Sequence, residues 1–249
     1  MVRRTGREAT LTSVAEALLP SARALISASE AALATVALHS QGLIRLGTVE
    51  SVSSFLLPRS LSAFRLHWPR VDLQITIGLC DNLRKRVRRF ELDAAITIEG
   101  SEHVANGQDG WTRKLATAQL SLVVSPLNPL ADGLIGREDL RCQTLLLADP
   151  NGAFNGLLRN WLGESDIGPK FESAGSIDGV KRGVQNGEAI GVLPAYAVAE
   201  ELTAGSLIEL KVRDPLPAIA LLLTTQGAPV ESSPLQNLTE QIGESLNAA

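Results

Sequence analysis

The first pattern along the chain is a stripe of apolar and small residues that recurs at alternating spacings of four and three. It comprises Leu11, Ala15, Leu18, Ala22, Leu25, Ser29, Ala32 and Val36, widened on one side by Leu19, Ile26 and Leu33. This spacing predicts an amphipathic helix with a heptad seam. Thr12 or Ser13 is the expected N-cap, and Pro20 predicts either a kink or a start at Ser21.

A long helix with a single apolar stripe usually needs a partner. We therefore interpret residues 11–41 as a dimerisation helix with Leu18, Leu25 and Leu33 on its contact face. The alternative is a helix that packs on its own domain. The preceding residues 1–10 are polar and basic, and Gly6 marks a turn among them.

From residue 42 onward, strand-like apolar runs alternate with helical segments. The predicted strands are Leu43–Val49, Val71–Ile77, Asp93–Ile98, Trp111–Ala116, Leu120–Ser125, Thr144–Ala148, Pro169–Ser173, Ala189–Leu193, Leu207–Leu210 and Ala218–Thr225. The predicted helices are Ser54–His67, Asp81–Phe90, Phe154–Leu162, Ile177–Gln185, Pro194–Ala204 and Pro234–Asn247. This alternation predicts an α/β fold with βαβ units and a mostly parallel sheet. A last strand and helix after two similar stretches indicate a chain that builds one lobe, crosses to a second and returns.

Composition narrows the class of protein. The formal net charge of −4 lacks the basic surplus that DNA-binding domains usually carry, so we do not expect this chain to bind DNA unaided. The two cysteines, Cys80 and Cys142, are far apart and in no metal-ligand spacing, which argues against a disulfide scaffold or a zinc site. No apolar run approaches the roughly 20 residues that span a bilayer, and no signal peptide is evident, so we expect a soluble cytoplasmic protein.

Signals of enzymatic chemistry are poor. The three histidines have no partnered nucleophile motif, and phosphate-binding loops of the P-loop or dinucleotide type are missing. We therefore expect no catalytic residues, no metal and no cofactor. A run of five basic residues between Arg84 and Arg89 spreads around its helix and is interpreted as a solvated face.

Short motifs in a fixed order resemble the LysR-type transcriptional regulators. The motifs are Arg3-Arg4-Thr5-Gly6-Arg7, Ala17-Leu18-Leu19-Pro20-Ser21-Ala22, Ile44-Arg45-Leu46-Gly47, Trp68-Pro69-Arg70-Val71, Glu91-Leu92-Asp93-Ala94-Ala95-Ile96, Asn128-Pro129-Leu130-Ala131 and Val184 to Pro194. Asn128 stands where the family has His, and Glu188-Ala189 stands where a glycine is usual. The resemblance covers essentially the whole chain.

The resemblance implies a two-lobed, periplasmic-binding-protein-like (type 2) effector domain preceded by the dimerisation helix. We assign residues 42–116 and 219–249 to lobe I and residues 117–218 to lobe II. Residues 1–10 resemble the wing of a winged helix-turn-helix, and we expect the rest of that DNA-binding head to be missing, through a misplaced start, a degraded gene or a natural short form. Arg3, Arg4 and Arg7 are then candidates for phosphate contacts, which position a protein without specifying sequence.

The resemblance also implies a small-molecule effector in a cleft between the lobes. Ligands of open α/β sheets bind at the carboxyl ends of strands. The candidate effector-binding residues are Ser51, Val52, Ser53, Cys80, Thr117, Phe154, Asn155 and Ser176. Hydroxyl and N–H groups at a helix start suit a carboxylate, whereas Glu50 disfavours an anion if it faces the cleft. Alternatively, Ser51 to Ser54 simply cap their helix, and Cys80 is a small buried residue.

The function we expect is that of a ligand-responsive bacterial transcription regulator that forms a homodimer or homotetramer and acts on promoter DNA in its full-length form. Two alternatives stay open. One is a stand-alone small-molecule binding protein, and the other is a dominant-negative partner that pairs with a full-length relative and does not bind DNA.

Overall fold

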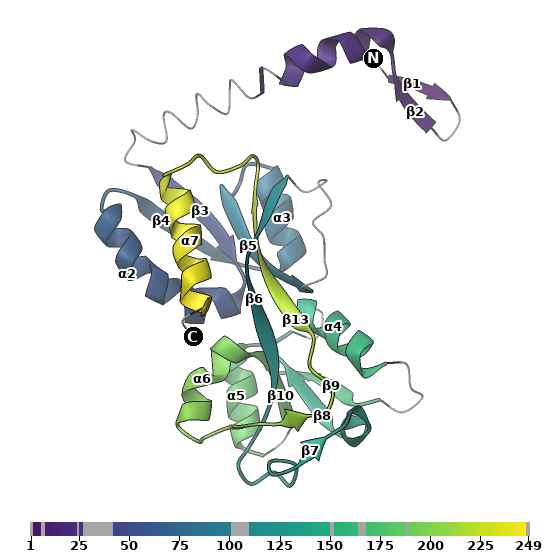
Figure 1. Cartoon of the computed structure of the whole chain (residues 1–249), viewed down its shortest axis with the longest axis vertical. Coiled ribbons are helices and arrows are strands. Elements are labelled where there is room, and N and C mark those ends of the chain that lie inside the picture. The colour runs from purple at the N-terminus through teal and green to yellow at the C-terminus, as the bar shows by residue number, and fades with distance from the viewer. Residues whose placement is uncertain are drawn as a thin grey trace. The chain divides into compact units, whose positions relative to one another are not determined.

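The computed structural model describes residues 2–5, 8–23, 25–26, 42–100, 110–149, 152–163, 168–187 and 189–247. The chain divides into two compact units, residues 1–42 and 43–249. Each unit is described by itself, and Figure 1 shows the elements of both.

The first unit begins with an antiparallel hairpin. Strands β1 (Val2–Thr5) and β2 (Glu8–Leu11) pair with Val2 opposite Leu11. A helix follows over residues 13–23 and 25–26. The backbone N–H of Ala15 donates to the hydroxyl of Thr12 at 3.3 Å, which makes Thr12 the N-cap. The helix therefore starts two residues later than the apolar stripe suggested, because Leu11 belongs to the hairpin, and it runs through Pro20 without a new start at Ser21.

One half of the second unit, lobe I, is built on parallel strands. Strand β3 (Leu43–Thr48) lies between β4 (Asp72–Ile77) and β5 (Ala94–Gly100), parallel to both. Strand β13 (Ala218–Thr225) returns antiparallel to β5 and pairs with the first part of β6 (Trp111–Val124). A π-helical turn, η1 (Val52–Leu56), leads into α2 (Leu57–His67), which packs against α7 (Pro234–Asn247), while α3 (Cys80–Arg88) packs against β5.

The other half, lobe II, uses the second part of β6. Strand β10 (Ile190–Pro194) pairs antiparallel with β6 and parallel with β8 (Thr144–Leu147), which in turn pairs with β9 (Lys170–Ser173). The helices are α4 (Ala153–Leu162), α5 (Ile177–Gln185) and α6 (Ala195–Thr203). Smaller elements complete the lobe: β7 (Leu134–Ile135), η2 (Arg137–Leu140), β11 (Ile208–Glu209) and β12 (Lys211–Val212).

Burial on both faces explains the strand sequences. In β5, Ala94, Ile96 and Ile98 join the main core cluster, whereas Ala95 packs with Leu83 of α3 on the opposite face. Strand β13 is buried along seven consecutive residues, as expected of a strand covered on both faces. Continuous apolar runs of this kind identify the sheet of an α/β domain.

The architecture confirms the predicted α/β class with two lobes, and it corrects two details. The runs Trp111–Ala116 and Leu120–Ser125 belong to one continuous strand, β6, which pairs with β13 in lobe I and with β10 in lobe II. The sheet is also less parallel than predicted, because β13 and β6 run antiparallel to their neighbours. Since β6 runs from one lobe into the other, the lobe boundaries at residues 116 and 218 stay predictions.

Candidate functional site: a cleft between the lobes

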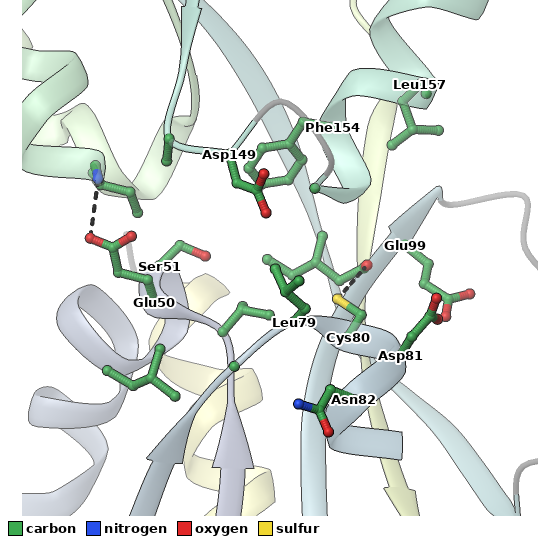
Figure 2. A pocket seen from close by; sticks show the side chains of 18 of the residues that line it. Glu50, Ser51, Leu79, Cys80, Asp81, Asn82, Glu99, Asp149, Phe154 and Leu157 are labelled. Carbon is green, nitrogen blue, oxygen red and sulfur yellow. Dashed lines mark hydrogen bonds between the residues drawn. The ribbon is translucent and has the colours of Figure 1, made fainter. Parts of the chain in front are cut away.

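A cleft of about 1110 Å³ lies between the two lobes. Lobe I contributes the loop after β3, the residues between β4 and α3, and the end of β5. Lobe II contributes Ala148 and Asp149 after β8, the start of α4 and the loop after β9. These segments follow the carboxyl ends of parallel strands, which is where open α/β sheets bind ligands. Figure 2 shows the side chains that line the cleft.

A buried hydrogen bond joins the lobes at one side of the cleft. The phenol of Tyr196, at the start of α6, donates to the hydroxyl of Ser51 at 2.8 Å. Both side chains are buried, and burial raises the pKa of Tyr196 well above its ordinary value, although the bond to Ser51 opposes this shift. The phenol is therefore a neutral donor, and Ser51 has one of its hydrogen-bonding positions filled by the protein itself.

A second contact between the lobes involves Glu50. Its carboxylate accepts a 3.1 Å hydrogen bond from the backbone N–H of Ile177, the first residue of α5, drawn as a dashed line in Figure 2. The N-terminus of a helix carries partial positive charge and free N–H groups, which attract an anion. Glu50 thus faces the cleft and supplies that anion from the opposite lobe.

Cys80 lies on the floor of the cleft at the start of α3. Its thiol donates to the backbone carbonyl of Ile98 at 3.5 Å. Burial raises the pKa of the thiol, and this effect outweighs the opposing effects of that hydrogen bond and of nearby Arg84. Because the thiolate is the reactive form of cysteine, this environment lowers the reactivity of Cys80.

Ion pairs at the edge of the cleft involve the basic run on α3. Arg84, largely buried, pairs with Glu99 at the end of β5 and with Asp81 one turn before it, the latter at 2.6 Å. Arg86 pairs with Glu91 at 3.2 Å. The run is therefore less solvated than its composition suggested, since Arg84 belongs to the lining of the cleft.

Three of the eight predicted effector-binding residues, Ser51, Cys80 and Phe154, line the cleft. Val52 does not, because its side chain is fully buried in the main core cluster. Ser53 is half-buried and lies outside the lining as well.

The remaining three predicted residues also lie outside the lining. Thr117 is exposed on β6, opposite Ala220 of β13. Asn155 accepts a 2.9 Å hydrogen bond from the guanidinium of Arg159 one turn later in α4. Ser176 is the N-cap of α5, where its hydroxyl accepts from the backbone N–H of Gly179 at 3.0 Å. The structure thus gives Ser176 the capping role that the sequence analysis had offered as an alternative only for Ser51 to Ser54.

Several lining residues were missed by the sequence analysis. Asp149 directly follows β8 and could have been found by the same strand-end rule that selected Cys80. The apolar lining residues Leu79, Ile98 and Leu157 carry no such signal. Tyr196, the one tyrosine in the sequence, contacts Ser51 only through the folded arrangement of the two lobes.

The predicted DNA and dimer contacts fall on the first unit. Arg3 and Arg4 lie on β1, while Arg7 and Leu33 lie outside the described residues. Leu18 and Leu25 are exposed on the helix, as are Leu19 and Ile26 of the same stripe and Val14 beside it. An exposed apolar stripe on a helix is what a surface for a partner requires.

The described residues contain no candidate metal site. In both units, no group of three or more His, Cys, Asp or Glu side chains among these residues is placed to hold a metal ion. In the same part of the chain, no helix is long and apolar enough to span a membrane.

Comparisons with known proteins agree with this geometry. The model of the LysR substrate binding domain family matches residues 38–247. A probable RuBisCO transcriptional regulator of Emiliania huxleyi is 24% identical over 98% of this chain and 80% of its own length. The uncharacterised HTH-type transcriptional regulator YeiE of Escherichia coli K12 is 26% identical over 72% of this chain but only 59% of its own length.

Solved structures show the same fold. A full-length OxyR variant from Pseudomonas aeruginosa superposes with a TM-score of 0.71 at 19% identity, covering 97% of this chain and 83% of that one. The regulatory domain of MetR from Neisseria meningitidis gives a TM-score of 0.63 at 21% identity, covering 83% and 94%. The two-lobed fold, its cleft and the family match identify a regulator domain and not an enzyme. The chain belongs to the LysR substrate binding domain family, the effector-binding part of LysR-type transcriptional regulators.

Proposed function

We propose that this chain senses a small molecule in the cleft between its lobes, and that the bound molecule changes lobe closure and thereby the arrangement of subunits that regulate transcription. The observation that carries the proposal is the cleft itself, which is formed by both lobes at the carboxyl ends of their parallel strands. A ligand held by both lobes stabilises their closed arrangement, because only that arrangement provides all of its contacts.

Among the predicted effector-binding residues, Ser51, Cys80 and Phe154 are the ones this proposal retains. A carboxylate effector, which the serine-rich loop after β3 suggested, is not supported. The carboxylate of Glu50 already occupies the N-terminus of α5, where the carboxylate of a ligand would otherwise be attracted.

The proposed assembly is a homodimer or homotetramer joined through the helix of the first unit, with Leu18 and Leu25 in the contact. Contact of Arg3, Arg4 and Arg7 with promoter DNA, and a cytoplasmic location, are parts of the same proposal. They rest on the resemblance of the N-terminal hairpin region to a wing and on the relatives named as transcriptional regulators.

Sensing by cysteine oxidation is a second candidate, suggested by the solved structures of reduced OxyR that share this fold. The environment of Cys80 disfavours it. The thiol is largely buried and its pKa is raised, whereas redox-sensing cysteines are accessible and have a lowered pKa.

Filling the cleft tests the proposal. Gly156 lines the cleft on α4, and nothing lies within 4 Å of the position that its Cβ would take. Gly156→Trp therefore occupies the cleft without a clash at its Cβ, and Gly168→Trp is a matched control, since Gly168 is equally open but lies outside the lining. In a thermal-shift screen of small metabolites of all charges, compounds that stabilise the wild type should also stabilise Gly168→Trp and lose their effect on Gly156→Trp. Equal stabilisation of all three proteins would refute binding in the cleft.

A further inference from the structure

On the side of the cleft nearest Ser51, two hydrogen bonds join the lobes within the protein. Tyr196 donates to Ser51 at 2.8 Å, and Glu50 accepts from the N–H of Ile177 at 3.1 Å. One turn further along α5, the ammonium of Lys181 lies 4.5 Å from the ring centre of Phe55 and pairs with Glu201 at 2.7 Å. An anionic ligand entering here would meet the charge of Glu50 where a helix N-terminus would otherwise attract it.

The charges that line the cleft are predominantly negative. Among the described residues, the lining contains four carboxylates and two cations: Glu50, Asp81, Glu99 and Asp149 against Arg84 and Lys85. Arg84 is paired with both Asp81 and Glu99, and Lys85 is exposed. A cleft lined by one sign of charge concentrates ligands of the opposite sign.

Lobe II presents a carboxylate and an aromatic ring to the cleft. Figure 2 shows the carboxylate of Asp149 and the ring of Phe154 directed into the space above Leu79 and Cys80. A carboxylate binds an ammonium through a charge-assisted hydrogen bond, and the face of an aromatic ring attracts a cation or stacks on an apolar group. The exposed side chain of Leu79 supplies apolar surface on the opposite side.

We propose that the cleft binds an organic cation, an amine with an apolar body, with its ammonium group at Asp149 and its body between Phe154 and Leu79. Glu50 is the residue that excludes carboxylates, because it holds the N-terminus of α5 from across the cleft. This inference rests on the proposed function, in that it takes the cleft to be the effector site and names the class of ligand.

Three probes of matched shape and different charge test the inference: 2-phenylethylammonium, 2-phenylethanol and 3-phenylpropanoate. Isothermal titration calorimetry on the wild-type chain should give the tightest binding for the ammonium, by about tenfold over the alcohol, as one charge-assisted hydrogen bond implies. Asp149→Asn should abolish that preference by removing the charge. Asp132→Asn is the control, because Asp132 is exposed and lies outside the lining, and it should leave the preference unchanged.

Glu50→Ala supplies the second arm. It frees the N–H groups of α5 and removes the negative charge, so 3-phenylpropanoate should gain about tenfold in affinity relative to the wild type. Tighter binding of the propanoate than of the ammonium by the wild type would overturn the inference but leave the cleft as an effector site. Equal affinity for the three probes in the wild type and in all three variants would also overturn it. Absence of binding by all three probes would overturn the inference, whereas the proposed function is judged separately, by the metabolite screen with Gly156→Trp.

Discussion

The phenol of Tyr196 and the hydroxyl of Ser51 form a buried 2.8 Å hydrogen bond although 145 residues separate them in the chain. The bond joins the start of α6 in lobe II to the residue that leads into η1 in lobe I. Because Ser51 also lines the cleft, this bond links the relative position of the lobes to the surface on which a ligand would lie.

Removing either partner of this bond should destabilise the domain. Ser51→Ala leaves the buried phenol of Tyr196 without its acceptor, which should lower the free energy of unfolding by about 1–3 kcal/mol. Tyr196→Phe removes the donor and should cost about 1 kcal/mol. Urea unfolding measures both losses, and the double variant should lose less than their sum, because the two residues share one interaction. Strictly additive losses would show that the bond contributes nothing.

Two glycines of the family-like motifs should resist even the smallest enlargement. A Cβ on Gly191 would lie 2.8 Å from Val184 and 3.0 Å from both Val123 and Val180, and one on Gly47 would lie 2.6 Å from Leu92. We expect Gly191→Ala and Gly47→Ala each to cost about 1–3 kcal/mol in unfolding free energy through overpacking.

Gly168→Ala is the control for this pair, because its Cβ would lie in open space. Its free energy of unfolding, measured in urea, should stay within about 0.5 kcal/mol of the wild-type value, the range typical of surface substitutions. If Gly191→Ala behaved like the control, the packing described around β10 would be wrong.

Packing of this kind also marks the limit of prediction from sequence. The glycine of the Gly191-Val192-Leu193-Pro194 motif was found by resemblance, but its reason, three valines from β6 and α5 around one Cα, needs the fold. The strand-end rule placed Ser51 and Cys80 on one edge of the sheet, because β3 and β4 are adjacent and parallel.

Contacts between the lobes were beyond the reach of local pattern. Glu50 and Ile177 are 127 residues apart, and no sequence motif near either residue predicts their hydrogen bond. The continuity of β6 was missed for a different reason: Ala116 to Gln119 are small or polar, so the stretch read as a break. In the structure these residues pair with β13, so β6 continues without a break from lobe I into lobe II.

The two cysteines should differ in reactivity toward an alkylating reagent. Cys142 is exposed, whereas Cys80 is largely buried with a raised pKa, so iodoacetamide at mildly alkaline pH should modify Cys142 first and Cys80 much more slowly. Peptide mass spectrometry of timed samples measures both rates. Faster modification of Cys80 would reverse the argument against thiol-based sensing.

The apolar stripe of the first unit should govern association. Replacing both Leu18 and Leu25 by aspartate places charges on an exposed apolar surface and should convert the proposed oligomer to monomer at micromolar protein concentration, as measured by sedimentation equilibrium. Ser21→Asp, an exposed change on the same helix, is the control and should leave the oligomer intact. A double variant that associated as the wild type does would place the contact elsewhere.

The central claim is that the effector binds in the cleft, and hydrogen–deuterium exchange tests it most directly. The experiment uses a compound from the thermal-shift screen that stabilises the wild type but does not stabilise Gly156→Trp. The account predicts slower exchange in three cleft segments, the peptides that contain residues 49–51, 77–85 and 152–157, because these residues border the cleft from both lobes. A smaller cavity of about 320 Å³, bordered by His67, Trp68 and Glu240, provides the contrast. Protection confined to the peptides around that second cavity, with the three cleft segments unchanged, would contradict the account.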